Sequence, residues 1–152
     1  IPDIVRALAA DKQVEVRNPF AVRPWQHVLE PLSGYLTLAA KQFENPIEFA
    51  DAYNFGPQKD DMLIVRDLVK QSIMYWGKGE FQEARRINRF HEAGLLQLDI
   101  HKAFEKLNWK PKLNSQSAIQ VTINWYKNQV MNGNAAFELL KQDIAAYSNE
   151  NG

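Results

Sequence analysis

Apolar side chains recur every three or four residues in six segments of the chain, the spacing of one face of an α-helix. One helix opens at Glu30 and Pro31, and another follows the acidic pair Asp60 and Asp61, which favours a helix N-terminus. We therefore predict helices in residues 1–10, 30–43, 62–76, 100–109, 119–130 and 137–147. Their apolar faces include Leu32, Tyr35, Leu36, Ala39, Ala40 and Phe43, then Met62, Val65, Val69, Ile73 and Trp76, then Ile119, Ile123, Tyr126 and Val130, and last Phe137, Leu140, Ile144 and Tyr147.

Four shorter segments have the pattern of strands. The sequence "KQVEVR" at 12–17 alternates apolar and polar residues, and "ADAYNFGP" at 50–57 is an apolar run closed by a Gly-Pro turn signal. The segments "WQHV" at 25–28 and "GLLQLD" at 94–99 are further candidates, the latter ending at Asp99, an N-cap residue for the helix that follows. The expected fold class is α/β: several helices and a few short strands in a single domain over residues 1–148, with a frayed tail at 149–152.

Composition narrows the range of functions. The 152 residues are 45% hydrophobic and carry 18 basic and 18 acidic side chains, so no net field attracts nucleic acid or an anionic membrane. There is no cysteine, which excludes disulfides and thiolate metal sites and fits a reducing compartment. No apolar run approaches the roughly 20 residues that span a bilayer. We expect a cytoplasmic domain without nucleic-acid or membrane partners, in which any anion site is local.

Common catalytic motifs are missing from the chain. The seven glycines form neither a dinucleotide-binding nor a P-loop pattern, and no GxSxG sequence occurs. His91 and Glu92 are adjacent, but no HExxH motif follows. The motifs therefore predict no catalytic residue and no metal site.

A series of motifs carries a family resemblance. The segments "RNPFAVRPWQHVLEPLSGYL", "YNFGP", "YWGKG", "HEAGLLQLD", "KAFEKLNWKPKL" and "TINWYKN" occur in this order. Together they resemble the C-terminal, substrate-binding half of the CDP-glucose 4,6-dehydratases, which are extended short-chain dehydrogenase/reductases. The resemblance covers roughly positions 1 to 128, and "RNPFAVRPWQHVL" is its most specific part.

The resemblance also indicates what this chain lacks. Members of that family carry a Gly-rich NAD loop and a Tyr-x-x-x-Lys pair in an N-terminal Rossmann half. Here none of the five tyrosines is followed by lysine four residues later. The family reaction oxidises C4 of CDP-glucose with NAD, eliminates water across C5–C6 and returns the hydride to C6, a lyase step in the deoxysugar biosynthesis that supplies lipopolysaccharide. The implied role is the substrate-binding half of such an enzyme, inactive alone and binding no cofactor, with NAD and the Rossmann half present in the complete enzyme.

Two arginines six residues apart, in a proline-broken loop, are the main candidates for binding the CDP-glucose. Arg23 matches the family's diphosphate-binding arginine, whose planar fork suits bidentate phosphate contacts, and Trp25 matches an aromatic position two residues on. Arg17 stands where related enzymes place an aromatic beside the base, and a guanidinium stacks there equally well. Asn18 either contacts the base or shapes the turn before Pro19. The alternatives are that the arginines are solvated loop residues and that Trp25 belongs to the core.

A second pair of candidates follows in "RFHEAGLLQLD". Arg89 lies ten residues before Asp99, where sugar-nucleotide epimerases and dTDP-glucose dehydratases place another phosphate-binding arginine. The family pattern more often has a different residue before "HEA", so "RFHEA" departs from it. Glu92 matches a carboxylate that accepts ribose hydroxyl hydrogens, with a surface carboxylate as its alternative, and His91 is interpreted as structural.

Three hypotheses remain open from the sequence. The chain is a partial dehydratase sequence, a stand-alone module that binds a nucleotide sugar without catalysis, or a structural or interaction domain that has lost the ligand. In the family, "AYNFGP" adds a strand to the Rossmann sheet, and the helix after Pro31 packs on that sheet. Cut from it, these surfaces would be exposed, so we also expect self-association through apolar surface.

Overall fold

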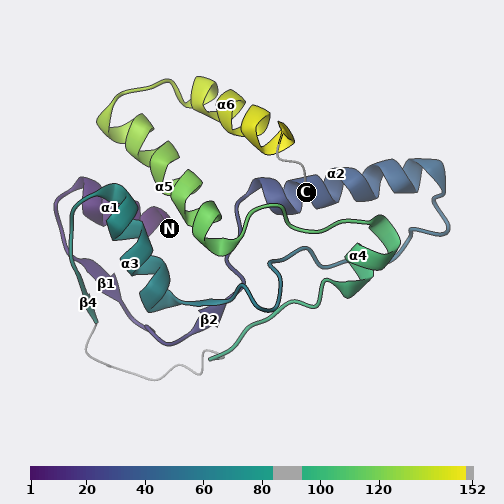
Figure 1. The fold of residues 1–152 in the computed structure, drawn as a ribbon, viewed down its shortest axis with the longest axis horizontal. Helices are drawn as coiled ribbons and strands as arrows, with labels where there is room; N and C mark the ends of the chain where they lie inside the picture. Colours follow the sequence, from purple (N-terminus) through teal and green to yellow (C-terminus); the bar gives the residue numbers. More distant parts are fainter. Residues whose placement is uncertain (84–93, 150–152) are drawn as a thin grey trace.

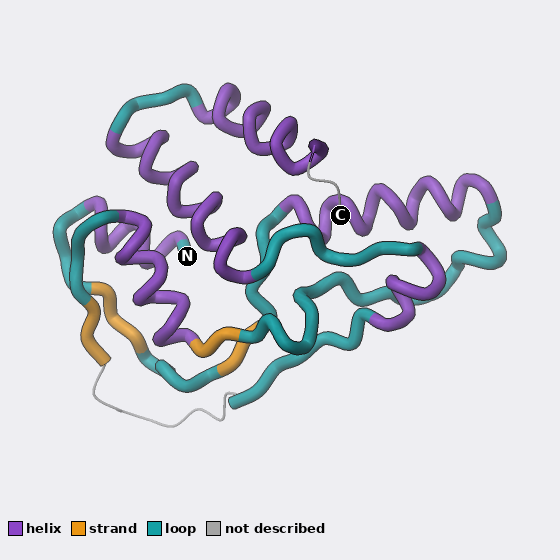
Figure 2. The backbone as a smooth tube through the Cα atoms, viewed as in Figure 1, coloured by secondary structure: helices purple, strands orange, loops and turns teal. Residues whose placement is uncertain are grey.

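The computed structural model describes residues 1–83 and 94–149, which form a mixed α/β arrangement (Figure 1). Helices dominate this part of the chain, and the strands are short (Figure 2). The helices are α1 (Pro2–Ala9), α2 (Leu29–Glu44), α3 (Val65–Trp76), α4 (His101–Leu107), α5 (Ser115–Met131) and α6 (Ala136–Asn149), and the strands are β1 (Val14–Val16), β2 (Val22–Arg23), β3 (Leu63–Ile64) and β4 (Phe81–Glu83).

The larger hydrophobic core lies between α1, α3 and α5. Helix α1 contributes three buried residues at helical spacing, and the parallel pair β1–β4 closes one side of the cluster. Its buried members are Ile4, Val5, Leu8, Val14, Val16, Leu68, Val69, Trp76, Ile119 and Ile123. The predicted helix faces of α1 and α3 therefore contribute to the core, and so do Ile119 and Ile123 of the predicted α5 face. Val130, at the end of that face, is instead exposed.

A second, separate core joins α2 to α4. The rings of Phe55 and Trp109 meet edge to face, with centroids 4.9 Å apart. Gly34 of α2 lies against the Phe55 ring so closely that a Cβ at this position would collide with it. The absent side chain thus lets the 52–57 segment pack onto α2.

Helix starts are secured by carboxylate and amide side chains. Asp61 accepts hydrogen bonds from the Ser115 backbone N–H at 2.5 Å and from its hydroxyl at 2.6 Å, while Asn114 caps α5 by accepting from the Ser117 N–H at 2.8 Å. The predicted N-cap, Asp99, is off by one residue, because Ile100 occupies that position. The Asp99 carboxylate still accepts from the His101 N–H at 2.9 Å. These bonds satisfy backbone donors that a helix leaves unpaired.

Several predicted strands differ from the structure. Residues 25–28 form a loop and a turn, and the nearby strand is β2, two residues earlier. Residues 50–57 are irregular, because a strand needs a neighbour and the described residues offer it none. Residues 94–99 make only a single bridge, from Leu95 to Val22. Strands β3 and β4 were not predicted, and Met62 precedes α3 instead of belonging to it.

Helix α2 has a buried side and an exposed apolar side. On the buried side, the Glu30 carboxylate accepts from the 112–113 backbone, and Gly34 lies against Phe55 of the second core. The opposite side, here called the outer face of α2, carries large hydrophobic side chains open to solvent. They are Leu32, Leu36 and Phe43, and Phe43 is 93% exposed.

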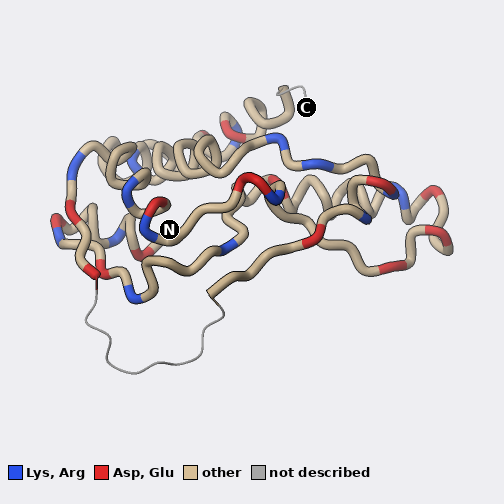
Figure 3. The backbone as a smooth tube through the Cα atoms, turned by 60° about the horizontal axis from the view of Figure 1, so that its bottom comes forward, with Lys and Arg blue, Asp and Glu red and all other residues tan. Residues whose placement is uncertain are grey.

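Charged residues are dispersed over the surface. Lys and Arg are interspersed with Asp and Glu over the described chain (Figure 3), and the net charge is zero. Most ion pairs are exposed contacts of the kind Lys102–Asp51, at 2.9 Å, which contribute little to stability. No helix in the described residues is long and apolar enough to cross a bilayer.

Candidate functional site

The short strand β2 anchors the segment that carries the predicted site. Val22 pairs with Ile64 of β3 in antiparallel register and with Leu95 through a parallel bridge on its other side. The Val22 N–H donates to the Gly94 carbonyl at 2.8 Å, and the Leu96 N–H donates to the Val22 carbonyl at 3.2 Å. The backbone next to Arg23 is therefore fixed from two sides.

Arg23 lies at the end of β2 and is partly buried. Its Nη1 donates to the Val22 carbonyl at 2.9 Å, and its own carbonyl accepts from the Trp25 N–H at 2.9 Å. Arg17 is exposed directly after β1, and Asn18 is half-buried with its carbonyl accepting from the Ala21 N–H at 3.3 Å. The 17–21 loop thus folds back on itself between the two arginines.

Trp25 packs against the larger core with its ring partly buried. Its indole Nε1 is shielded from solvent and has no hydrogen-bond partner among the residues that the structure describes. A buried N–H without an acceptor lowers the stability of the fold, so this indole N–H is available to donate to a bound group. Arg17, Asn18, Arg23 and Trp25 belong to one stretch of sequence, in which Arg17 is exposed after β1 and Trp25 packs on the larger core. Arg89, His91 and Glu92 lie outside the described residues.

Two further residues at this segment were not identified from the sequence: Phe20, which lies within it, and Arg66 of α3, which contacts it. The Arg66 guanidinium carbon lies 4.4 Å from the centroid of the Phe20 ring, and the same guanidinium pairs with Glu83 of β4. The Arg66 N–H donates to the Pro19 carbonyl at 2.9 Å. The two residues are 46 positions apart, and no periodicity in the sequence relates them.

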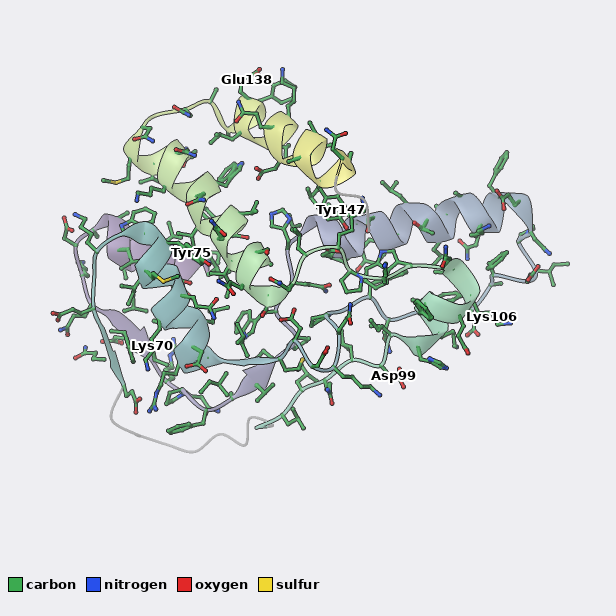
Figure 4. All side chains as sticks on the ribbon, viewed as in Figure 1. Lys70, Tyr75, Asp99, Lys106, Glu138 and Tyr147 are labelled. Atoms are coloured by element: carbon green, nitrogen blue, oxygen red, sulfur yellow. The ribbon has the colours of Figure 1, made fainter. Side chains whose placement is uncertain are left out.

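A buried carboxylate ties the start of α2 to the rest of the fold. Glu30 has no exposed surface, and it accepts from the Leu113 N–H at 2.7 Å, from the Lys112 N–H at 3.1 Å and from the Tyr147 hydroxyl at 2.8 Å. Tyr147 reaches down from α6 toward the N-terminal end of α2 (Figure 4). The Trp109 indole N–H donates to the Ser33 hydroxyl at 2.9 Å in the same network. Every donor here meets an acceptor, as a buried charge requires.

His27, just before α2, is also buried. Burial lowers the pKa of its imidazole from the ordinary 6.5, since the charged form is the one that burial disfavours. Nδ1 accepts from the Leu29 N–H at 3.4 Å, which requires that nitrogen to be unprotonated. His27 is therefore a neutral structural residue.

Two hollows border the segment that leads into β3. One of about 560 Å³ is lined by Gln58, Lys59, Asp99, Ile100, His101, Phe104 and Lys110. The other, of about 350 Å³, is lined by Gln58, Asp60, Asp61 and residues 111–114. Neither includes a predicted site residue. In the described residues, no three His, Asp or Glu side chains gather closely enough to hold a metal ion.

Comparison with known proteins confirms the resemblance found in the motifs. The CDP-glucose 4,6-dehydratase of Salmonella typhimurium (strain LT2) is 35% identical over 147 residues, which is 97% of this chain and 41% of that protein. The crystal structure of dTDP-glucose 4,6-dehydratase from Bacillus anthracis, in complex with NAD, shares the fold with a TM-score of 0.67 at 21% identity. That match covers 84% of this chain and 38% of the other. No protein-family model matches the chain.

Proposed function

We propose that this chain is the nucleotide-sugar-binding portion of a CDP-glucose 4,6-dehydratase, whose NAD-binding residues lie outside the 152 residues. The observation that carries the proposal is 35% identity to a CDP-glucose 4,6-dehydratase along 97% of the chain. The matched region is 41% of that relative, which supports the proposal that a complete enzyme contains more protein than these 152 residues.

The segment after β1 lacks the usual dinucleotide-binding pattern, which supports placing the NAD site outside this chain. Dinucleotides bind where a strand leads through a glycine-rich turn into a helix N-terminus. Strand β1 instead leads into the 17–21 loop, which contains no glycine and continues into β2. No step of the reaction is therefore assigned to residues of this chain, and its proposed contribution is binding and orientation.

Arg23 is the proposed diphosphate ligand. Its backbone is held in β2 between β3 and Leu95, and its Nη1 donates to the Val22 carbonyl at 2.9 Å, so both ends of the side chain are restrained. A pre-positioned guanidinium loses less conformational entropy on meeting phosphate oxygens than one on a free loop. Arg17 and Asn18, on the same loop, are the proposed contacts on the base side, and Arg89 and Glu92 remain predictions for the second phosphate and the ribose.

The proposed NAD-binding part would cover surfaces that are bare in this chain. The outer face of α2 presents Leu36, which is 72% exposed, and Phe43, which is 93% exposed. The 52–57 segment offers backbone groups without a strand partner among the described residues. Apolar helix faces and unpaired extended segments of this kind are normally covered in a complete protein.

Calorimetry with CDP-glucose tests the proposal on the isolated chain. We expect binding in the millimolar range, since half of the cleft is missing, and Arg23→Ala should abolish it. Arg6→Ala is the matched control, because Arg6 is an exposed arginine of α1 paired with Asp3. With NAD supplied, we expect no keto-sugar product, which its alkaline absorbance would reveal.

The same titration separates the alternatives. Micromolar affinity would contradict the proposal and support a stand-alone binding module, and formation of the keto-sugar would show that the chain is a complete enzyme. Absence of binding even at high millimolar ligand would favour a structural or interaction domain. Equal binding by the wild type and Arg23→Ala would remove Arg23 from the site.

A further inference from the structure

An exposed aromatic ring is fixed at the tip of the loop between the two candidate arginines. Phe20 is 56% exposed, although it sits three residues from Arg23 in a segment otherwise held by backbone hydrogen bonds. The guanidinium of Arg66 covers its ring at 4.4 Å. With one face covered and more than half of the side chain exposed, the other face is open to solvent.

The ring is held in place by contacts on both sides of it in the sequence. The Pro19 carbonyl accepts from the Arg66 N–H, and the Ala21 carbonyl accepts from the Val65 N–H, each at 2.9 Å. Both donors lie in the first turn of α3, so the loop tip is clamped to that helix. Phe20 therefore does not need to be ordered when a ligand arrives.

The Arg66 side chain is itself constrained. Glu83 of β4 pairs with its guanidinium, which is only 29% exposed, and its Nε is buried without a hydrogen-bond partner among the described residues. A planar cation stacked on one face of an aromatic ring fixes the plane of that ring. The contact with Arg66 therefore restricts the Phe20 ring while more than half of the residue stays exposed.

We propose that Phe20 is the stacking platform for the nucleobase and that Arg66 is the positioning residue behind it. This inference rests on the proposed function, because the ligand is taken to be a nucleotide whose phosphates meet Arg23. Aromatic platforms stack any flat base, since every base offers a π-face. Phe20 thus supplies affinity without distinguishing cytosine from uracil, and base identity is read by other groups.

The test uses cytidine and inorganic pyrophosphate as probes for the two halves of the ligand, with CDP and UDP as whole nucleotides. Ligand-observed NMR titration measures the affinity of each for the 152-residue chain. We expect Phe20→Ala to weaken cytidine and CDP about fivefold, the lower end of the effect of removing a base-stacking aromatic. Phe20→Tyr should bind like the wild type, and UDP should lose as much affinity as CDP. Arg66→Ala should weaken cytidine less than Phe20→Ala does, and pyrophosphate should be unaffected by either change.

Phe43→Ala is the matched control, because it removes another highly exposed phenylalanine, on the outer face of α2. Circular dichroism and the melting temperature should match the wild type for both phenylalanine variants. The platform is overturned if Phe20→Ala leaves the affinity for cytidine unchanged. It is also overturned if cytidine does not bind to the wild type. An equal loss in Arg17→Ala together with no loss in Phe20→Ala would give the stacking function to Arg17.

Failure of the platform and failure of the proposed function give different results. If Arg23→Ala weakens pyrophosphate binding but Phe20→Ala leaves cytidine binding unchanged, the platform is rejected and the nucleotide-sugar function is still supported. If Phe20→Ala weakens cytidine binding but Arg23→Ala leaves pyrophosphate binding unchanged, the platform is supported and the phosphate assignment is rejected. Loss of both dependences rejects both.

Discussion

Replacing Glu30 by glutamine tests whether the buried carboxylate holds α2, α6 and the 110–113 segment together. The carboxylate is fully buried and receives hydrogen bonds from the Leu113 N–H at 2.7 Å, the Lys112 N–H at 3.1 Å and the Tyr147 hydroxyl at 2.8 Å. Glutamine has nearly the same shape but only one acceptor oxygen. Its NH₂ group would face a donor, so at least one buried donor would lose its acceptor.

The expected loss can be estimated from these contacts. An unsatisfied buried donor costs about 1–3 kcal/mol, and each remaining bond loses its charge assistance. Removal of a buried charge relieves part of its desolvation cost, which offsets some of this loss. We expect Glu30→Gln to lower the free energy of unfolding by about 2 kcal/mol, or the melting temperature by about 4–8 °C for a chain of this size.

Urea denaturation followed by circular dichroism measures the change, with two companion variants. Tyr147→Phe removes one donor to Glu30 and should cost about 1 kcal/mol. Glu44→Gln makes the same chemical change on the same helix, but Glu44 is an exposed residue paired with Lys41 at 3.3 Å and should cost close to nothing. Equal stability of the Glu30 and Glu44 variants would refute the reasoning.

Three further outcomes follow from the structure. Gly34→Ala should destabilise the fold by about 1–3 kcal/mol, because the added Cβ collides with Phe55, and a melting curve measures this. Burial lowers the pKa of His27, so as the pH falls the unfolded state binds a proton before the folded state does, and stability should fall below pH 6.5. His27→Gln should remove this dependence. Urea titrations at pH 5 to 7, values chosen to bracket the ordinary pKa, measure it. Changing Leu36 and Phe43 together to lysine should lower self-association in sedimentation velocity, whereas an unchanged association state would show that the outer face of α2 is not responsible.

Helical periodicity proved the most informative part of the sequence. The spacing of apolar residues identified α2 and α3 because each helix repeats its pattern over several turns. The same pattern indicates that one face of the helix is apolar, but it does not indicate which other segment packs against that face. Leu32, Leu36 and Phe43 fit a buried stripe in the sequence, yet they are exposed in the structure.

Strand prediction failed where pairing decided the outcome. Residues 50–57 have the composition of a strand, but a strand exists only with a partner, and none of the described residues provides one. Strand β2 is two residues long and is defined by β3 and Leu95, which are distant in sequence. Its short apolar pattern alone gave no signal.

The candidate site divides in the same way. Arg17, Asn18, Arg23 and Trp25 were identified from the family resemblance of one stretch of sequence, residues 17–25. The functions assigned to them stay predictions. Residues whose importance depends on long-range contacts were missed, since sequence spacing carries no information about them. Glu30 meets the Leu113 backbone 83 positions away, and Phe20 meets Arg66 across 46.

The division of the interior into two clusters affects how the molecule opens. The cluster around α1, α3 and α5 holds ten buried residues, whereas the one between α2 and α4 holds five. Cooperative units of unequal size unfold at unequal free energies, so the smaller lobe can detach while the larger remains intact. In such a partial unfolding event, β1 and the larger cluster would stay folded. The part that unfolds would be the α2–α4 cluster, which includes the outer face of α2.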